Sequence, residues 1–152
     1  ARSYRAYFLR DPDQSGLDFW FAKVNAGWST ARVSDFFATS DEFIARYGAL
    51  DDAAFVDLIY KNVLGRPADD AGKAYWVKQL ETARKTRGQV MVGYSESNEY
   101  KTATAARVNV IITTYALLRR PPTDAEIQAG TAMTTDALVA SIVPTAAYIA
   151  RF

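Results

Sequence analysis

The fold is decided by residues 4–20, YRAYFLRDPDQSGLDFW, which the chain repeats 56 positions later as residues 60–76, YKNVLGRPADDAGKAYW. Aligned without gaps, the two stretches are identical at five of 17 positions. The shared residues are Tyr4 and Tyr60, Arg10 and Arg66, Asp13 and Asp69, Gly16 and Gly72, and Trp20 and Trp76. Chance at ordinary composition gives roughly one identity over such a length. The chain is therefore predicted to contain tandem repeat units.

Each copy reads as a helix, a turn and a second helix. Apolar residues within 4–8 are spaced i, i+3, i+4, which is typical of one helix face. Pro12 then breaks the pattern, and Asp13 or Ser15 is placed to cap the next helix. Further on, Thr39 to Glu42 has the pattern of a capping box. These periodicities predict an all-α chain.

A third and degraded copy follows the first two. Arg120-Pro121 aligns with Arg66-Pro67, whereas Glu126 and Gly130 replace the repeated Gly and Trp. We expect two clear repeat units and a degenerate third, at approximately residues 4–48, 51–103 and 108–152, packed as one compact domain over residues 1–152. A degenerate terminal copy is typical of the capping repeat of a stacked repeat protein.

The segment from Tyr100 to Leu118 contains neither Gly nor Pro. One long helix or two helices meeting near Thr104 would both fit. The β-branched run from Val108 to Thr114 resembles a strand, but its place in the repeat favours a helix.

Composition excludes several classes of function. The chain has 152 residues, 18 basic and 17 acidic side chains, and neither Cys nor His. Disulfides, thiolate zinc sites and catalysis by imidazole are therefore excluded. The even charge disfavours nucleic acid as a partner, and no apolar run is long enough to insert into a membrane. Motifs of a nucleophile or a phosphate loop are missing, so we expect no enzyme and no cofactor.

No signal peptide begins at Ala1, which we read as a fragment's start.

Three tryptophans are candidate sugar-stacking platforms. Trp20 and Trp76 recur at equivalent positions, which favours a place in the core, where each would bury a large apolar area. Trp28 has no aromatic counterpart and follows Gly27 in a connection. It is the candidate binding residue, although a role as a lid over the core is the favoured interpretation.

The repeated arginines have two interpretations. Arg10, Arg66 and Arg120 could form a row that binds an anionic ligand. We favour ion pairs, with Asp13 or Asp69, or with Glu42 or Glu99, because the acidic residues repeat together with the arginines. Ala147 occupies the corresponding place in the third copy. Arg120 is therefore expected to be freer.

Asp11, Asp13, Ser15 and Gly16 open like an EF-hand calcium loop, with oxygens at positions 1, 3 and 5 and glycine at 6. The twelfth position holds Ala22, where such loops have a bidentate Glu. A helix cap explains Asp13 and Asp69 without metal, so calcium is an alternative and we expect no metal site.

The segments 11–20 and 64–76, with Ser40 to Phe43 and Ser97 to Tyr100, resemble a bacterial family, domain of unknown function 4214. That family is distantly similar to the phycobilisome linker domain. The resemblance covers roughly residues 4 to 100. It implies an all-helical, non-catalytic module of a larger secreted or cell-surface protein, sometimes beside calcium-binding repeats or carbohydrate-active domains. It supplies no catalytic residue and no ligand.

The expected function is that of a non-catalytic protein-interaction or structural spacer module that contacts other domains or subunits. The first alternative is carbohydrate binding by exposed aromatic residues, with Trp28 as the stacking residue. The second is calcium-dependent binding at Asp11, Asp13 and Ser15.

Overall fold

A computed structural model describes residues 1–152, and it is entirely helical, as the periodicity predicts. Eleven α-helices and one π-helical segment, η1, follow each other without any strand. Their bounds are α1 Arg2–Phe8, α2 Gln14–Asn25, α3 Thr30–Ala38, α4 Asp41–Tyr47, α5 Asp52–Ile59, η1 Tyr60–Leu64, α6 Asp70–Glu81, α7 Arg87–Ser95, α8 Asn98–Leu118, α9 Asp124–Gly130, α10 Thr135–Ile142 and α11 Ala146–Ile149.

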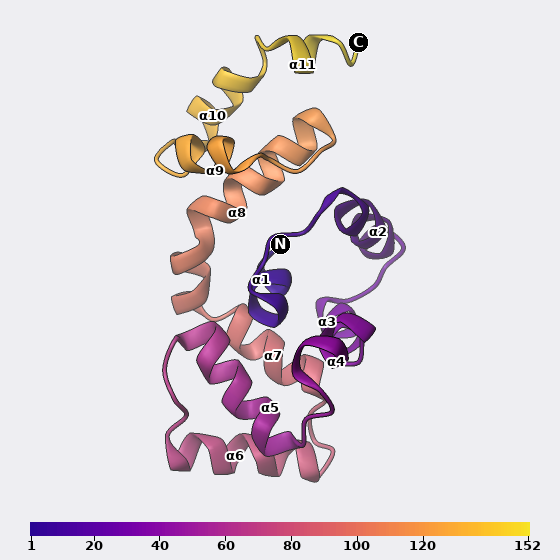
Figure 1. The fold of residues 1–152 in the computed structure, drawn as a ribbon, viewed down its shortest axis with the longest axis vertical. Helices are drawn as coiled ribbons and strands as arrows, with labels where there is room; N and C mark the ends of the chain where they lie inside the picture. The colour runs from indigo at the N-terminus through magenta and orange to yellow at the C-terminus, as the bar shows by residue number, and fades with distance from the viewer.

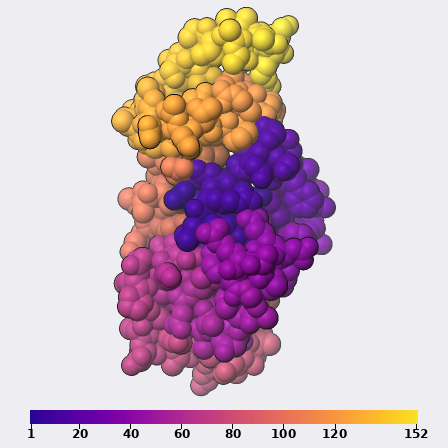
Figure 2. Space-filling view, in the orientation of Figure 1, coloured from indigo at the N-terminus to yellow at the C-terminus, as the bar shows by residue number.

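The molecule is elongated, and α8 connects its two ends (Figure 1). Helix α6 lies at one end, and α9, α10 and α11 lie at the other. The space-filling view shows the same division, with the C-terminal segment gathered at one end and the N-terminal residues in the middle (Figure 2).

Side-chain caps fix most of the helix starts that the sequence predicts. The carboxylates of Asp13 and Asp69 accept hydrogen bonds from the backbone N–H of Gly16 and Gly72, at 2.7 and 2.8 Å. The capping box expected at residues 39–42 is wrong. Ser40 caps α4 instead, and the Glu42 side chain bonds to Arg10. A charged donor offers that carboxylate a stronger hydrogen bond than a backbone N–H does.

The main core joins α1, α3, α4, α5 and α7. Tyr7, Phe43, Phe55 and Met91 are fully buried in it. Helices α3 and α7 cross closely, because the backbone N–H of Gly88 bonds to the Asp35 carboxylate at 2.8 Å. Since a Cβ at Gly88 would collide with the Asp35 backbone, the crossing depends on this glycine.

The question left open at residues 100–118 has one answer: α8 is a single helix that includes the whole β-branched run. Its first half faces the main core, and its second half packs on α9 and α10 around Val110. There a second, smaller core holds Val110, Ile127, Leu138 and Ile142. None of the helices combines the length and the hydropathy that crossing a membrane requires.

Candidate binding site

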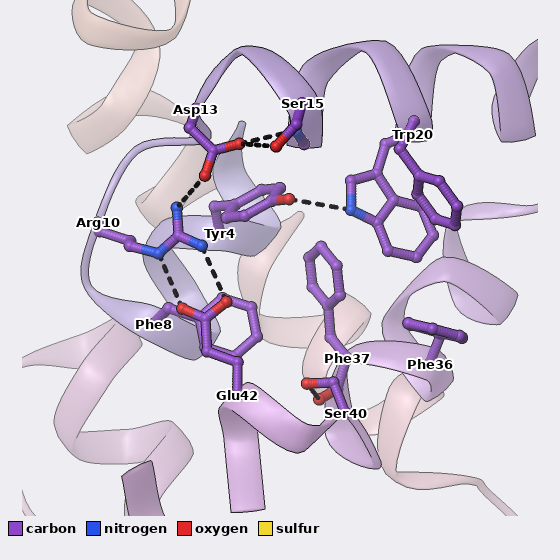
Figure 3. Close-up of a pocket in the computed structure, with 12 residues that line it drawn as sticks. Tyr4, Phe8, Arg10, Asp13, Ser15, Trp20, Phe36, Phe37, Ser40 and Glu42 are labelled. Atoms are coloured by element: carbon purple, nitrogen blue, oxygen red, sulfur yellow. Dashed lines mark hydrogen bonds and ion pairs between the residues drawn. The ribbon is translucent and has the colours of Figure 1, made fainter. Parts of the chain in front are cut away.

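A hollow of about 420 Å³ opens at the first signature segment, between the start of α2 and the helices α1, α3 and α4. Its volume lies within the range of small-molecule sites in proteins. Figure 3 shows two kinds of wall: the charged side chains of Arg10, Asp13 and Glu42 lie together, and aromatic rings face them. We call this cavity the signature hollow.

The charged wall is a clamp around Arg10. Its Nε and Nη2 donate to the two carboxylate oxygens of Glu42, each at 2.8 Å, and Nη1 lies 3.7 Å from Asp13. The hydrogen bond from Arg10 lowers the pKa of the Glu42 carboxyl below its usual value. Bonds from the Gly16 backbone and the Ser15 hydroxyl lower the pKa of Asp13. Both carboxylates are therefore held in the charged form.

The aromatic wall comes from three helices. Trp20 Nε1 donates to the Tyr4 hydroxyl at 3.1 Å, and the Trp20 ring meets Phe37 edge-on at 4.8 Å between centroids. Burial is the main cause that raises the pKa of the Tyr4 phenol. At the mouth, Phe19 and Phe36 are 45% and 46% exposed, so apolar ring surface faces solvent beside the charged clamp.

The repeated glycine has a steric reason in both copies. A Cβ on Gly16 would fall within 3.0 Å of the Tyr4 hydroxyl, and a Cβ on Gly72 would meet the Tyr60 hydroxyl in the same way. Arg10 and Arg66 lie over the rings of these tyrosines, at 5.0 and 5.2 Å from the centroids. The signature thus packs a tyrosine under the first turn of the following helix.

Asp11 anchors the first signature turn to α8. Arg107 donates to its carboxylate at 2.9 Å through Nε and 2.5 Å through Nη2, and Arg5 adds a bond at 3.2 Å. Burial alone would raise the pKa of Asp11, but the bonds from the two guanidinium groups lower it. Sequence reasoning missed this pair, since 96 positions separate Asp11 from Arg107 and no repeat relates them.

Of the three residues of the calcium alternative, Asp13 and Ser15 are hydrogen-bonded to each other, and Asp11 is paired elsewhere. Asp11 is engaged by Arg107, whereas Asp13 accepts from the Gly16 N–H and from the Ser15 hydroxyl. Nowhere does the structure bring together three or more acidic side chains in a group suited to a metal ion. The turn thus serves as a helix start and as an anchor.

Trp28, the candidate binding residue, lies between α2 and α3 and is half-buried against the main core. The Arg32 guanidinium sits 3.9 Å from its ring centroid, and Lys23 Nζ lies at 5.1 Å. Trp20 meets it edge-on at 6.4 Å. Its ring is thus surrounded by cationic and aromatic neighbours, so little of its face is left for stacking.

The second signature segment lacks the clamp. Among the acidic side chains, Arg66 approaches only Asp69, at 3.9 Å. The predicted pair between Arg66 and Glu99 is not formed. Trp76 is half-buried against the main core, as Trp20 is, and packs on Tyr94 at 5.5 Å. The predicted ion pair therefore holds fully for Arg10 and only weakly for Arg66.

The expectation that Arg120 would be freer is wrong. Its guanidinium forms a two-pronged pair with Glu126, at 2.8 and 2.7 Å. Glu126 occupies the place where the other copies have glycine, so the third copy gains a local carboxylate in exchange. The pair is the main cause that lowers the pKa of Glu126 to about 2.

A second surface feature is an apolar groove between α2 and α8, with a volume of about 430 Å³. Eight of its nine lining residues are apolar, and Arg119 is the only charged side chain among them. Phe21, Val24 and Ile112 along it are 52%, 54% and 57% exposed. The groove was not foreseen from the sequence, because α2 and α8 are far apart in the chain.

The chain was compared with protein-family models, curated proteins and solved structures, and a family model matches. Residues 34–104 fit the family model described as Domain of unknown function (DUF4214). The match runs from α3 into α8, so it includes the second signature segment and excludes the first. That coverage is narrower than the expected residues 4 to 100. No curated protein and no solved structure matches the chain.

These comparisons give no support to the similarity with phycobilisome linkers. Over residues 34–104, slightly less than half of its length, the chain is similar to the family described as Domain of unknown function (DUF4214).

Proposed function

We propose that the chain is a non-catalytic protein-interaction module that binds an amphipathic helix of a partner protein in the groove between α2 and α8. The observation that carries the proposal is the groove itself, an open channel lined almost wholly by apolar side chains. Exposed apolar surface of this kind marks interaction sites on folded proteins.

The shape of the groove favours a helix as the occupant. Two helices border it, and a third helix can lay a stripe of side chains at i, i+3, i+4 and i+7 between them. Leu17, Trp20 and Tyr115 contribute to the lining along the channel, together with the more exposed side chains. Few polar groups are present for the backbone of an extended peptide.

Arg119 sets the expected charge of the partner. It ends α8 in the left-handed conformation, and its side chain forms no salt bridge. An acidic residue beside the partner's apolar stripe would complete a charge-assisted pair with this guanidinium. The partner is therefore an apolar helix face with a carboxylate at one end.

The carboxyl groups of the signature hollow support a non-catalytic role. Hydrolysis by paired carboxylates needs one group with a raised pKa as the general acid. The pKa values of Asp13 and Glu42 are lowered instead, by the hydrogen bonds that they accept. No histidine or cysteine is present to serve in their place.

A display library of amphipathic helices tests the proposal. We expect enriched binders to have an apolar stripe, and Phe21→Ser and Ile112→Asn each to weaken them at least tenfold. Losing one buried apolar side chain costs about 1.5–3 kcal/mol, which corresponds to such a change. Ile44→Asn, at an exposed apolar position on α4, is the matched control and should leave affinity unchanged.

Failure to enrich any helix, or binders that tolerate both groove variants, would refute the proposal. Sedimentation velocity identifies the case in which the partner helix belongs to a second copy of the chain. The cellular setting follows from the family resemblance and is also proposed: a larger secreted or cell-surface bacterial protein. An export signal in the parent chain would support that setting.

A further inference from the structure

We propose that the signature hollow is a binding site for a neutral saccharide, with a different opening from the protein-binding groove although Trp20 lines both. One sugar ring would place its hydroxyl groups on the clamp of Arg10, Asp13 and Glu42 and its C–H face against Phe36 and Phe19. This site goes beyond the proposed protein interaction, and it lies elsewhere than Trp28, where the sequence had suggested stacking.

The separation of the two walls is the first argument. Figure 3 shows the charged side chains on one side and Trp20 with Phe36 on the other, with Phe37 between them. A pyranose ring is amphipathic in the same sense, since its hydroxyls project at the edge and its C–H groups form an apolar face. A pocket of this volume holds such a ring with room for a neighbour.

The charge of the clamp, one guanidinium and two carboxylates, disfavours an anionic ligand and suits the hydroxyl groups of a neutral one. Glu42 neutralises Arg10 through two hydrogen bonds, and Asp13 lies close enough to share the guanidinium. An anionic ligand would meet two carboxylates, and a cationic one would meet Arg10. Hydroxyl groups avoid both conflicts, because they donate to carboxylates and accept from guanidinium groups.

The carboxylates of the clamp have hydrogen-bond acceptor positions left for a ligand. A carboxylate offers about four acceptor positions, and Glu42 uses one position on each oxygen for Arg10. The side chains of Glu42 and Asp13 are 41% and 61% exposed, so their free positions face solvent. Their charged acceptors make stronger hydrogen bonds than neutral ones do.

The apolar wall is accessible without rearrangement. Phe36 lies on the outer face of α3 and meets Trp20 edge-on at 5.3 Å between centroids. Phe19 lies 6.5 Å from Phe36 between ring centroids and carries Lys23 at 5.1 Å. The two phenylalanine rings thus border one opening and are held in place by neighbours.

The second signature segment is an internal contrast. Helix α7 lies 57 positions after its counterpart α3, so Gly93 stands where α3 has Phe36 and the second copy lacks the exposed ring. Arg66 has no glutamate partner, and the hollow beside it is lined mainly by charged residues. Only the first copy therefore combines the clamp with the aromatic wall.

An array of neutral and acidic oligosaccharides, followed by calorimetry on the neutral binders, tests the proposal. We expect reproducible neutral hits, with affinity reduced at least tenfold in Phe36→Ala and in the conservative variant Glu42→Gln. Tyr75→Ala removes an exposed aromatic residue on α6, at the position equivalent to Phe19, and should leave affinity unchanged. Helical content and melting temperature confirm that each variant folds.

No binding on the array, a preference for acidic glycans, or neutral binding that survives both hollow variants would overturn the proposal. Phe21→Ser and Ile112→Asn should leave sugar binding intact, because neither residue lines the hollow. Loss of helix binding with retained sugar binding, or the reverse, therefore separates the two proposals.

Discussion

The two signature segments share their turn and differ in what surrounds it. In both, an aspartate caps the second helix and a glycine packs on a tyrosine hydroxyl. The first segment adds the two-pronged pair of Arg10 with Glu42 and the anchor of Asp11 on Arg107. The second has Pro67 in place of Asp11, and its Arg66 remains exposed.

The difference shows which features a repeat determines. Contacts within the segment, such as cap to backbone and glycine to tyrosine, recur because every atom that they need is repeated. Contacts with the rest of the chain depend on what packs beside each copy. Since α8 lies beside the first turn, only that turn has been tied to a distant helix.

Removing the anchor should have the largest effect. Asp11→Ala leaves two guanidinium groups without their carboxylate, and hydrogen bonds to charged groups contribute about 1.5–3 kcal/mol. We therefore expect the free energy of unfolding in urea to fall by about 2–3 kcal/mol. Arg107→Met should cost a similar amount, and the double variant little more, because both remove the same interaction.

The pH dependence of the anchor has a definite sign. The pKa of Asp11 is lower in the folded than in the unfolded state, so its contribution is complete above the unfolded value of about 4. It is lost as the pH falls through the folded pKa. The stability gap between wild type and Asp11→Ala should therefore shrink in acid, and a constant gap from pH 7 to pH 2 would contradict this account.

Because the two segments share the same turn, we expect the same substitution to lower the free energy of unfolding by a similar amount in each copy. Gly16→Ala and Gly72→Ala each place a methyl group against a tyrosine hydroxyl that is held in a packed core. Overpacking costs about 1–3 kcal/mol, and the better helix propensity of alanine returns up to about 1. We expect each variant to lose about 1–2 kcal/mol in urea unfolding.

A second substitution distinguishes a steric cause from a general effect of alanine. Tyr4→Phe removes the hydroxyl that the Gly16→Ala methyl would meet, and Tyr60→Phe does the same for Gly72→Ala. Each pair should cost less than the sum of its members. Strict additivity in either copy would show that the close approach is not what selects glycine there.

The sequence predicted the parts of this fold whose partners are near in the chain. Asp13 and Asp69 were expected as caps, and the β-branched run of α8 was expected to be helical. Each depends on periodicity or on a residue three positions away. The position of the glycines was also visible, although the tyrosine hydroxyl that requires them was not.

What the sequence could not predict depends on tertiary packing. Asp18 accepts from Tyr115 across 97 positions, and this bond joins the two helices that form the groove. No repeat or motif relates these residues. The pairing of Arg120 with Glu126 was missed for another reason. The prediction considered only the loss of the repeated glycine from the degenerate copy, whereas Glu126, which replaces that glycine, is the partner of Arg120.

The smallest expected effect is the contribution of the ion pair between Arg10 and Glu42 to the free energy of unfolding. Glu42 and Glu99 both lie in the first turn of a helix, so Glu42→Gln and Glu99→Gln lose the same favourable interaction with the helix dipole, about 0.3–1 kcal/mol. Only Glu42→Gln also loses the ion pair with Arg10. Solvent partly screens this pair, which contributes about 0.5 kcal/mol to stability. In urea at low salt, Glu42→Gln should be the less stable variant by that margin. The margin should narrow at about 0.5 M NaCl, where exposed charges are screened within a few ångströms. Equal stabilities at low salt would mean that the ion pair between Arg10 and Glu42 adds nothing to folding.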